Sequence, residues 1–372
     1  MKLTHRCNQC QKTFPHAYTP KCTYCGGLVD IYYDLSRVKI YDSPHSLEKY
    51  FDLLPIQDSQ NLLPLGEGNT PCVHAKALGE ALGLKQVFLK VESRNPTGTT
   101  KDRMAAVVLS FFKELQITEF VSSSTGNSSN ALAHGILKYP YFKMHLFIGG
   151  EFQERVRFSD FNPGVLLHVL TGKTFAEAFN QAREYAFHHH LPFEAGFFNP
   201  ARREGLKLAF LEAVDQVPVE IRWYFQAVSS AMGIYGTYKG AKEFQTLGRI
   251  RHIPRMVCVQ QESCCPMVKA FEEGSPVIRE HHIVKNPKGI AKAILRGNPI
   301  TSYPYIYRLV RETKGTFTSV TETEIKEAKA LLFQLEKLDC GYTAATTIAA
   351  LKKLVDQRVV PPEEGVLLNL TD

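Results

Sequence analysis

The sequence lacks any apolar run long enough to cross a membrane. Runs such as VLLHVL and GVLLNL have the length of a strand, whereas a spanning helix needs about 20 apolar residues. The opening residues MKLTHRCNQCQK contain no apolar segment of the kind that a signal peptide carries. With 372 residues and 44% hydrophobic content, the chain has ample material for a core. We therefore expect a globular, cytoplasmic protein without a membrane partner.

The sequence also lacks a basic tract. Its formal net charge is +7, but the lysines and arginines are scattered instead of gathered into a run with interleaved aromatic residues. An anionic small substrate explains the positive charge as well as a nucleic acid does. We predict no nucleic-acid partner.

Two common nucleotide-binding motifs are missing. The segment LTGKT at 170–174 resembles part of a phosphate-binding loop, but Leu167 occupies the position where that motif requires glycine. No G-x-G-x-x-G follows the first strand, as a dinucleotide-binding fold would require. The spacing therefore excludes both familiar nucleotide sites.

Four of the nine cysteines form two C-x2-C knuckles near the N-terminus. They are Cys7, Cys10, Cys22 and Cys25. Each knuckle offers two thiolates from one tight turn, and two facing knuckles complete a tetrahedral zinc site. Four thiolates leave no open coordination position, so the metal would be structural. The spacing predicts a zinc ribbon over residues 1–35, and the alternative is a ribbon whose thiols bind no metal.

After a linker, short β-branched runs alternate with amphipathic helical patterns. We predict strands at 87–92, 119–124, 144–149, 165–170, 223–228, 255–260 and 365–370. Helical periodicity occupies KDRMAAVVLSFFKEL, TFAEAFNQAREYAF, TETEIKEAKALLFQLEKL and TAATTIAALKKLVDQ. This alternation indicates an α/β fold with parallel sheets covered on both faces. Ligands of such sheets bind in the loops beyond the carboxyl ends of the strands.

Three of these junctions are polar and built from small residues. The first holds Ser123, Ser124, Thr125, Gly126, Asn127 and Ser128. The second holds Ser229, Ser230, Ala231, Met232 and Gly233, and the third places Thr343 at the head of TAATTIAAL. One such loop is typical of an ordinary capped helix. Three in one α/β chain favour a ligand site, since amides at a helix start bind anions.

Lys101 stands at the first turn of a predicted helix, after the turn-forming segment NPTGTT. The amide dipoles of a helix N-terminus disfavour a positive charge there. Such a lysine is a candidate for a lowered pKa, and a neutral amine can form a Schiff base. The alternative is a solvated lysine at an ordinary helix start.

Taken together, several segments resemble one enzyme family. LGEGNTP (65–71), NPTGTTKDR (95–103), SSTGNSS (123–129) and NPARREGLK (199–207) are similar to motifs of the threonine synthase and cysteate synthase-like family, which are pyridoxal-phosphate enzymes of fold type II. The cysteine ribbon, GNP at 297–299 and LLNLTD fit the same family, so the resemblance covers nearly the whole chain. It implies a tryptophan synthase β-like fold of two parallel-sheet subdomains behind the ribbon. We expect a large cofactor-binding subdomain at 36–116 and 196–372, and a small subdomain at 117–195 with the Asn127 loop.

The resemblance also implies roles for single residues. Lys101 would bind pyridoxal 5'-phosphate covalently and act as general base, Asn127 would contact its phenolic oxygen, and Thr343 would face its pyridine nitrogen. The loop Ser229, Ser230, Ala231, Met232 and Gly233 would surround its phosphate. The substrate carboxylate would lie against Ser123, Ser124, Thr125, Gly126 and Ser128, and Arg202 would bind a substrate phosphate. A hydroxyl at Thr343 favours elimination and replacement over transamination.

The chain departs from the family pattern at three places. Thr100 stands where an aromatic residue usually precedes the lysine, the phosphate loop reads SSAMG, and GGEFQERVRFSDF (149–161) supplies Arg155 and Arg157 where a glycine-lysine segment is common. We expect a homodimeric lyase that converts O-phosphohomoserine and water into threonine and phosphate. The alternatives are β-replacement on O-phosphoserine, a specialised-pathway lyase or synthase, and a zinc-ribbon nucleic-acid binder with a degenerate enzyme domain.

Overall fold

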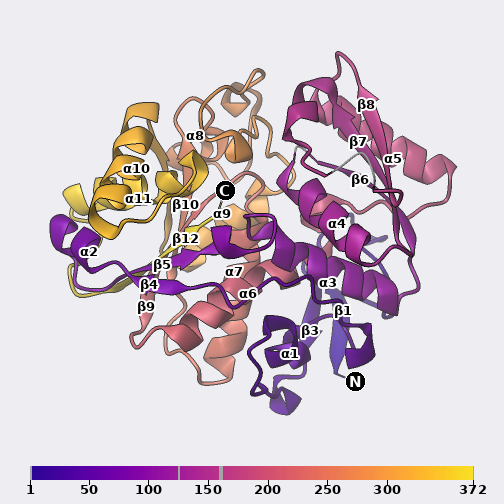
Figure 1. The fold of residues 1–372 in the computed structure, drawn as a ribbon, viewed down its shortest axis with the longest axis horizontal. Helices are drawn as coiled ribbons and strands as arrows, with labels where there is room; N and C mark the ends of the chain where they lie inside the picture. Colours follow the sequence, from indigo (N-terminus) through magenta and orange to yellow (C-terminus); the bar gives the residue numbers. More distant parts are fainter. Residues whose placement is uncertain (1, 125, 159–161, 372) are drawn as a thin grey trace. The chain divides into compact units, whose positions relative to one another are not determined.

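The computed structural model describes residues 2–124, 126–158 and 162–371. The chain divides into two compact units (Figure 1). The first comprises 1–69, 95–97 and 101–206, and the second comprises 70–94, 98–100 and 207–372. None of the helices in the described ranges combines the length and apolar character that a membrane span needs.

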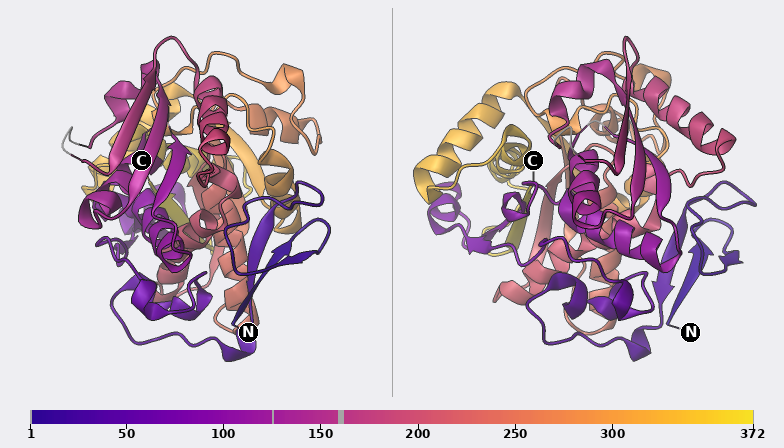
Figure 2. Two further views of the ribbon diagram at one scale, coloured as in Figure 1. Left: turned by 90° about the vertical axis from the view of Figure 1, so that its right-hand side faces the viewer. Right: turned by 45° about the vertical axis from the view of Figure 1, so that its right-hand side comes forward.

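The first unit begins with a small antiparallel sheet in the order β2-β1-β3 (Figure 2). Its strands are β1 (Leu3–Cys7), β2 (Thr13–Phe14) and β3 (Val29–Tyr33). The buried apolar cluster of this ribbon consists of Cys7, Cys22 and Val29, with Phe14 packed against it. So small a core contributes little hydrophobic stabilisation, which is why ribbons of this size usually need a metal or a larger partner surface.

The remainder of the first unit contains a parallel sheet in the order β6-β7-β8. Its strands are β6 (Glu119–Ser123), β7 (Lys143–Gly149) and β8 (Val165–Leu170). Its helices are α1 (Ser46–Lys49), α3 (Lys101–Glu114), α4 (Asn127–Lys138) and α5 (Phe175–His188). Helix α5 packs on β6 and β7, and α4 packs on β7 and α3. Every residue from Asp102 to Phe112 is buried, so α3 lies in the core of this unit.

The second unit contains a six-stranded sheet in the order β11-β10-β9-β12-β5-β4. The strands are β4 (Cys72–His74), β5 (Val87–Val91), β9 (Ile221–Ala227), β10 (Arg255–Gln261), β11 (Thr316–Val320) and β12 (Gly365–Leu370). All neighbours are parallel except β4, which runs antiparallel to β5. The last strand in sequence, β12, lies between β9 and β5 and is buried throughout.

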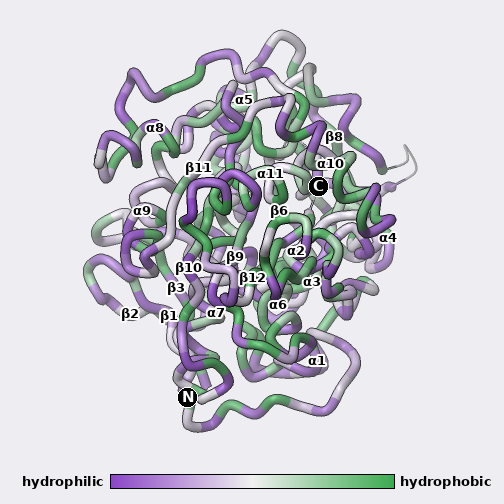
Figure 3. Tube along the Cα trace, turned by 90° about the vertical axis from the view of Figure 1, so that its left-hand side faces the viewer, coloured by the Kyte–Doolittle hydropathy of each residue, from purple (hydrophilic) through white to green (hydrophobic). Residues whose placement is uncertain are grey.

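Helices cover this sheet. They are α2 (Lys76–Leu82), α7 (Met232–Thr246), α8 (Pro266–Glu272), α9 (Tyr303–Glu312), α10 (Glu322–Glu336) and α11 (Tyr342–Asp356). Helix α11 contacts four strands, β9 to β12, and also packs against α10. Helix α6 (Pro200–Gln216) begins in the first unit and continues in the second. In the trace coloured by hydropathy, green stretches lie in the interior and purple residues along outer loops (Figure 3).

The predicted strands and helices all form, and the α/β class with parallel sheets is confirmed. Sequence reasoning missed β11, whose TFTSV is rich in hydroxyl residues, and β4, which has three residues at a sheet edge. The units also differ from the predicted subdomains, because α3 and residues 36–69 belong to the first unit. One physical reason is bonding between segments far apart in the sequence: the Glu114 carboxylate at the end of α3 accepts hydrogen bonds from the Gln57 and Asp58 amides.

Candidate active site

Lys101 is the first residue of α3, as the sequence predicts. Its side chain is half-buried. The turn before it is closed by Asp102, whose carboxylate accepts hydrogen bonds from the backbone N–H and the hydroxyl of Thr97, each at 2.8 Å. Gly98 between them has φ +81°, a conformation that favours glycine. The turn chemistry therefore places the lysine at a helix N-terminus and fixes the backbone around it.

Thr100, the residue before Lys101, is hydrogen-bonded at the carboxyl-terminal ends of the strands of the six-stranded sheet. The Thr100 N–H donates to the hydroxyl oxygen of Thr371 at 3.2 Å, and Thr371 directly follows β12. Within the second unit, the Thr100 backbone is therefore held beside the carboxyl end of a central parallel strand. Ligands of open α/β sheets bind at that edge.

The motif LGEGNTP folds against the loop that leads to Lys101. The Gly68 N–H donates to the Asn95 side-chain oxygen at 3.0 Å, and the Leu65 N–H donates to the Glu67 carboxylate at 2.6 Å. Burial raises the pKa of Glu67 to about 7, although hydrogen bonds from its own amide and that of Leu65 oppose the shift. A cavity of about 430 Å³ borders Glu67, with His45, Glu48 and Lys138 also in its wall.

The serine-rich loop connects β6 to α4. Gly126 precedes the helix with φ 141° and ψ −87°, and no side chain caps the helix start. The Ser124 hydroxyl accepts from the Gly126 N–H at 3.3 Å, and the Ser129 hydroxyl donates to the Gly126 carbonyl at 2.6 Å. Asn127 and Ser128 are the first residues of α4, whereas Thr125 lies outside the described residues.

Ser123, at the carboxyl end of β6, has a hydroxyl that is buried without a hydrogen-bond partner among the described residues. An unpaired buried hydroxyl costs roughly 1–3 kcal/mol unless a ligand or water satisfies it. The Ser123 hydroxyl is therefore a hydrogen-bonding group in the loop for which the sequence predicts a substrate anion.

An arginine lies over the same loop. A Cβ built on Gly126 would stand 3.3–3.5 Å from the side chain of Arg155, including its guanidinium. The backbone around Arg155 is tied to α4 by Asn130, which donates to the Arg155 carbonyl at 3.0 Å and accepts from the Arg157 N–H at 2.9 Å. Burial and the neighbouring Arg157 charge lower the pKa of Arg155. An arginine nevertheless stays charged at neutral pH, so positive charge lies beside the start of α4.

Arg202 lies two residues inside the start of α6 and is buried. Two nitrogen atoms of its guanidinium contact the two carboxylate oxygens of Glu194, and the third donates to the Ser128 hydroxyl at 3.1 Å. Glu194 also accepts from the Asn199 amide at 2.9 Å. Sequence reasoning missed Glu194, because nothing in NPARREG points to a carboxylate eight positions before the arginine. The positive charge of Arg202 is therefore compensated inside the protein.

The second unit carries the other predicted cofactor residues. Ser229 and Ser230 lie between β9 and α7, and Ala231 precedes the helix with φ 60° and ψ 27°. Ala231 provides no side-chain cap for α7, so the first amides of the helix receive no capping acceptor from this residue. A Cβ on Gly233 would stand 2.1 Å from the Gln226 side-chain nitrogen, so any larger residue requires the Gln226 side chain to move. An uncapped helix start of this kind fits a phosphate group.

Thr343 is the second residue of α11 and is buried. The helix starts after Gly341, which makes no side-chain cap, and the Thr346 hydroxyl donates to the Thr343 carbonyl at 2.7 Å. Thr343 therefore lies at the start of a helix, where the sequence predicts it. The first unit thus holds Lys101 and the loop predicted to bind the substrate, and the second holds the loop predicted to bind the cofactor phosphate and Thr343.

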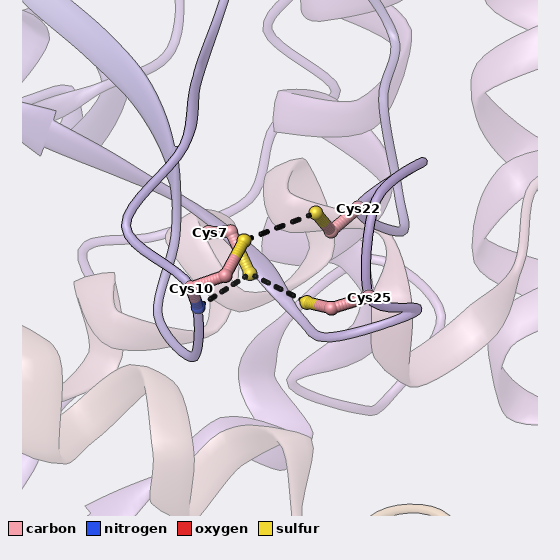
Figure 4. Close-up of side chains that lie close together, drawn as sticks. All are labelled: Cys7, Cys10, Cys22 and Cys25. Atoms are coloured by element: carbon pink, nitrogen blue, oxygen red, sulfur yellow. Dashed lines mark hydrogen bonds between the residues drawn. The ribbon is translucent and has the colours of Figure 1, made fainter.

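The four knuckle cysteines come together in the first unit (Figure 4). Their sulfur atoms all lie within 4.8 Å of one another, and the Cys7–Cys25 and Cys10–Cys22 sulfur pairs are each 3.5 Å apart. The Gln9 and Cys10 amides donate to the Cys7 sulfur at 3.4 and 3.5 Å. Amide donors stabilise a thiolate, and four such sulfurs fit a tetrahedral zinc ion.

A second cluster of potential metal ligands does not fit a metal. Glu273, His281 and His282 converge in the second unit. However, the Arg279 N–H donates to Nδ1 of His282 at 2.9 Å, so the hydrogen of the neutral ring is on Nε2. That nitrogen donates to Glu273 at 2.9 Å and has no lone pair for a metal. Glu273 therefore forms hydrogen bonds with His281 and His282, and the cluster does not form a metal site.

Comparison with known proteins gives a consistent set of relatives. Residues 63–372 match the family model described as pyridoxal-phosphate dependent enzyme. Threonine synthase from Methanosarcina acetivorans is 32% identical over 94% of this chain and 86% of its own, and that from Methanocaldococcus jannaschii is 30% identical over 99% and 92%. Cysteate synthase from Methanospirillum hungatei is 24% identical over 99% of this chain and 89% of its own.

Solved structures share the fold. Processed threonine deaminase isoform 2 from Solanum lycopersicum superposes with a TM-score of 0.65 at 18% identity, covering 85% of this chain and 86% of that one. Serine racemase from Dictyostelium discoideum gives 0.61 at 20% identity, covering 82% and 92%.

Proposed function

The chain belongs to the pyridoxal-phosphate-dependent enzymes of fold type II, and we propose that it expels phosphate from an O-phosphorylated amino acid and adds a small nucleophile. The first candidate reaction is that of a threonine synthase, in which O-phosphohomoserine and water give threonine and phosphate. The observation that carries it is similarity to threonine synthases at 30–32% identity over 94–99% of this chain. The chain is accordingly a pyridoxal-phosphate-dependent lyase.

The chain's residues fit the cofactor. When bound, pyridoxal phosphate serves as an electron sink for negative charge at the substrate α-carbon. The uncapped start of α7, with Ser229 to Gly233, offers amides for its phosphate. Asn127 at the head of α4 and Thr343 at the head of α11 offer polar side chains for its ring. Lys101 offers the amine that attaches it.

Lys101 is also the proposed general base. With the cofactor bound, the Lys101 amine would take the proton from the α-carbon of the substrate and return it later. A helix N-terminus favours the neutral amine that this step needs. The hydroxyl of Thr343 does not supply the negative charge that would keep a pyridine nitrogen protonated, which favours elimination and replacement.

The substrate-binding residues gather around the start of α4. Ser123, Ser124 and the α4 amides offer donors for the substrate carboxylate, and the buried Ser123 hydroxyl has unused bonding capacity among the described residues. We propose that Arg202 contributes to the phosphate subsite mainly through directed hydrogen bonds, since Glu194 already compensates its charge. Arg155 adds positive charge over Gly126.

We further propose one structural zinc ion at Cys7, Cys10, Cys22 and Cys25. The support is the convergence of the four sulfurs and the small apolar core of the ribbon. A closed set of four thiolates gives the ion no part in the chemical step. The homodimer and the cytoplasmic location stay predictions from the sequence.

A second candidate is β-replacement on O-phosphoserine, as in a cysteate synthase-like enzyme that adds sulfite. The specific observation in its favour is a cysteate synthase relative that spans 99% of this chain. Membership of an enzyme family, together with Lys101 at the predicted position, argues against a nucleic-acid binder with a degenerate enzyme domain.

Phosphate release from three substrates decides between the candidates. The purified enzyme is mixed separately with O-phosphohomoserine, O-phosphoserine and O-phosphothreonine, while phosphate and the cofactor spectrum are followed. We expect release from O-phosphohomoserine with threonine as product. Release from O-phosphoserine alone assigns the enzyme to β-replacement, and no spectral change with any of the three refutes the phosphorylated substrate.

A further inference from the structure

The ribbon is bonded to the segment that carries Arg202. The Tyr18 hydroxyl lies 2.9 Å from the Phe193 carbonyl oxygen and 2.7 Å from that of Glu194. Burial raises the pKa of Tyr18 well above its ordinary value, so the hydroxyl keeps its hydrogen and donates. Tyr18 lies between the two cysteine knuckles, so the position of this donor depends on the fold of the ribbon.

Strand β3 of the ribbon makes four further hydrogen bonds to the same segment. The Asp30 carboxylate accepts from Arg203 at 2.8 and 3.2 Å, and the Val29 carbonyl accepts from the same guanidinium at 2.7 Å. The Tyr33 hydroxyl donates to the Glu204 carboxylate at 2.9 Å. Arg203 is fully buried, so its ion pair is shielded from water.

The residues that the ribbon contacts flank Arg202 on both sides in sequence. Glu194 binds the Arg202 guanidinium at two points, and Arg203 and Glu204 follow Arg202 on α6. Arg202 in turn donates to the Ser128 hydroxyl, and Ser128 is the neighbour of Asn127 at the start of α4. A continuous set of polar contacts, part-buried at Tyr18 and buried from Glu194 onward, therefore runs from the ribbon to the loop at the start of α4, entirely within the first unit.

We propose that the ribbon is a positioning element for the substrate-binding residues, and that Tyr18 is the positioning residue which transmits its fold to the Glu194–Arg202 pair. Metal binding at the knuckles then stabilises the fold of the ribbon. The ribbon in turn holds the backbone of residues 193–204 in position, and Arg202 orients the Ser128 side chain through its hydrogen bond. The inference rests on the proposed function, since it gives the ribbon a part in substrate affinity and none in proton transfer at the α-carbon.

The test compares two single-atom deletions in the same ribbon. Tyr18→Phe removes the hydroxyl that reaches Glu194, whereas Tyr24→Phe, the control, removes a hydroxyl from a side chain that is 70% exposed and contacts Phe14 and Lys12. Both holoenzymes are assayed for zinc content, cofactor absorbance, KM and kcat. Hydrogen exchange of residues 193–204 gives a readout independent of activity.

We expect Tyr18→Phe to raise KM for the phosphorylated substrate roughly two- to tenfold, the loss of one hydrogen bond. We also expect an unchanged kcat, unchanged zinc content and faster exchange at 193–204. Tyr24→Phe should match the parent in every measurement. Tyr33→Phe, which removes the bond to Glu204, should repeat the Tyr18→Phe pattern.

Three results would overturn the proposal: parental KM in both Tyr18→Phe and Tyr33→Phe, faster exchange at 193–204 without a change in KM, or loss of zinc from Tyr18→Phe, which would place its effect at the metal site. If the parent releases phosphate from none of the three phospho-amino acids, the proposed function fails instead. Removal of zinc by a chelator would still test the mechanical link, because it should accelerate exchange at 193–204 in the parent.

Discussion

Replacing Glu67 by glutamine should make the protein more stable at neutral and alkaline pH. The Glu67 side chain is 8% exposed, and burial raises its pKa to about 7. Glutamine has nearly the same shape and keeps an oxygen that can accept from the Leu65 N–H, a bond of 2.6 Å in the parent. The substitution therefore removes a buried charge while retaining the main contact.

The magnitude follows from proton linkage. Because the folded-state pKa of Glu67 lies above the ordinary value of 4.5, the stability that the protonated carboxyl contributes is complete below about 4.5 and is lost as pH rises through about 7. Each pH unit in this window costs about 1.4 kcal/mol, or about 3 kcal/mol in total. As pH rises from 5.5 to 8, the free energy of unfolding of the glutamine variant should increase by about 2 kcal/mol relative to that of the parent.

Urea unfolding at several pH values, followed by circular dichroism, measures the difference in free energy of unfolding between Glu67→Gln and the parent. Circular dichroism is preferred to fluorescence because the single tryptophan, Trp223, lies in the second unit and Glu67 in the first. The control is Glu48→Gln, an exposed carboxylate in the wall of the same cavity, where the substitution removes no buried charge and should not reproduce the gain in stability of Glu67→Gln. A difference in free energy of unfolding between Glu67→Gln and the parent that does not change from about pH 5.5 to about pH 8 would refute the argument.

Four further substitutions test the site. Lys101→Ala should abolish covalent attachment of the cofactor, and borohydride reduction of the parent followed by peptide mapping should find the adduct on Lys101 and on no other lysine. The double variant Cys7→Ser, Cys10→Ser should lose zinc, so unchanged metal content would exclude these ligands. Gly126→Ala should lower the free energy of unfolding by about 1–3 kcal/mol, since its φ is 141°; unchanged thermal unfolding would contradict this. Arg202→Ala should reduce kcat/KM roughly tenfold to a hundredfold or more, and parental kinetics would remove the arginine from the subsite.

Local chemistry made much of the site predictable. The start of α3 at Lys101 and the start of α4 at Asn127 follow from turn-forming and small residues after strand-like runs. The same reasoning located the loop before Met232, where α7 begins. Each of these signals lies within a few residues of the position it predicts, which is why no tertiary information was needed.

Long-range pairing was not predictable in this way. Glu194 reaches Arg202 because residues 193–199 fold back against the start of α6, and no periodicity in the sequence encodes that turn. The division of the chain has the same origin, since Glu114 binds the loop at 57–58 and so assigns α3 to the first unit. A side-chain bond across the turn at 193–199 decided the first outcome, and bonds between segments 56–57 positions apart decided the second.

Helix α6 shows why such bonds matter for this fold. Its Arg203 and Lys207 are fully buried, although charged residues in a sequence pattern ordinarily indicate a solvent-facing side. Arg203 pairs with Asp30 across 173 positions and Lys207 with Glu243 across 36. Buried ion pairs add little net stability compared with apolar packing, but breaking one typically costs about 3–5 kcal/mol. Their effect is therefore to specify which segments pack together: Lys207–Glu243 joins α6 to α7, and Arg203–Asp30 joins the ribbon to the helix that presents Arg202.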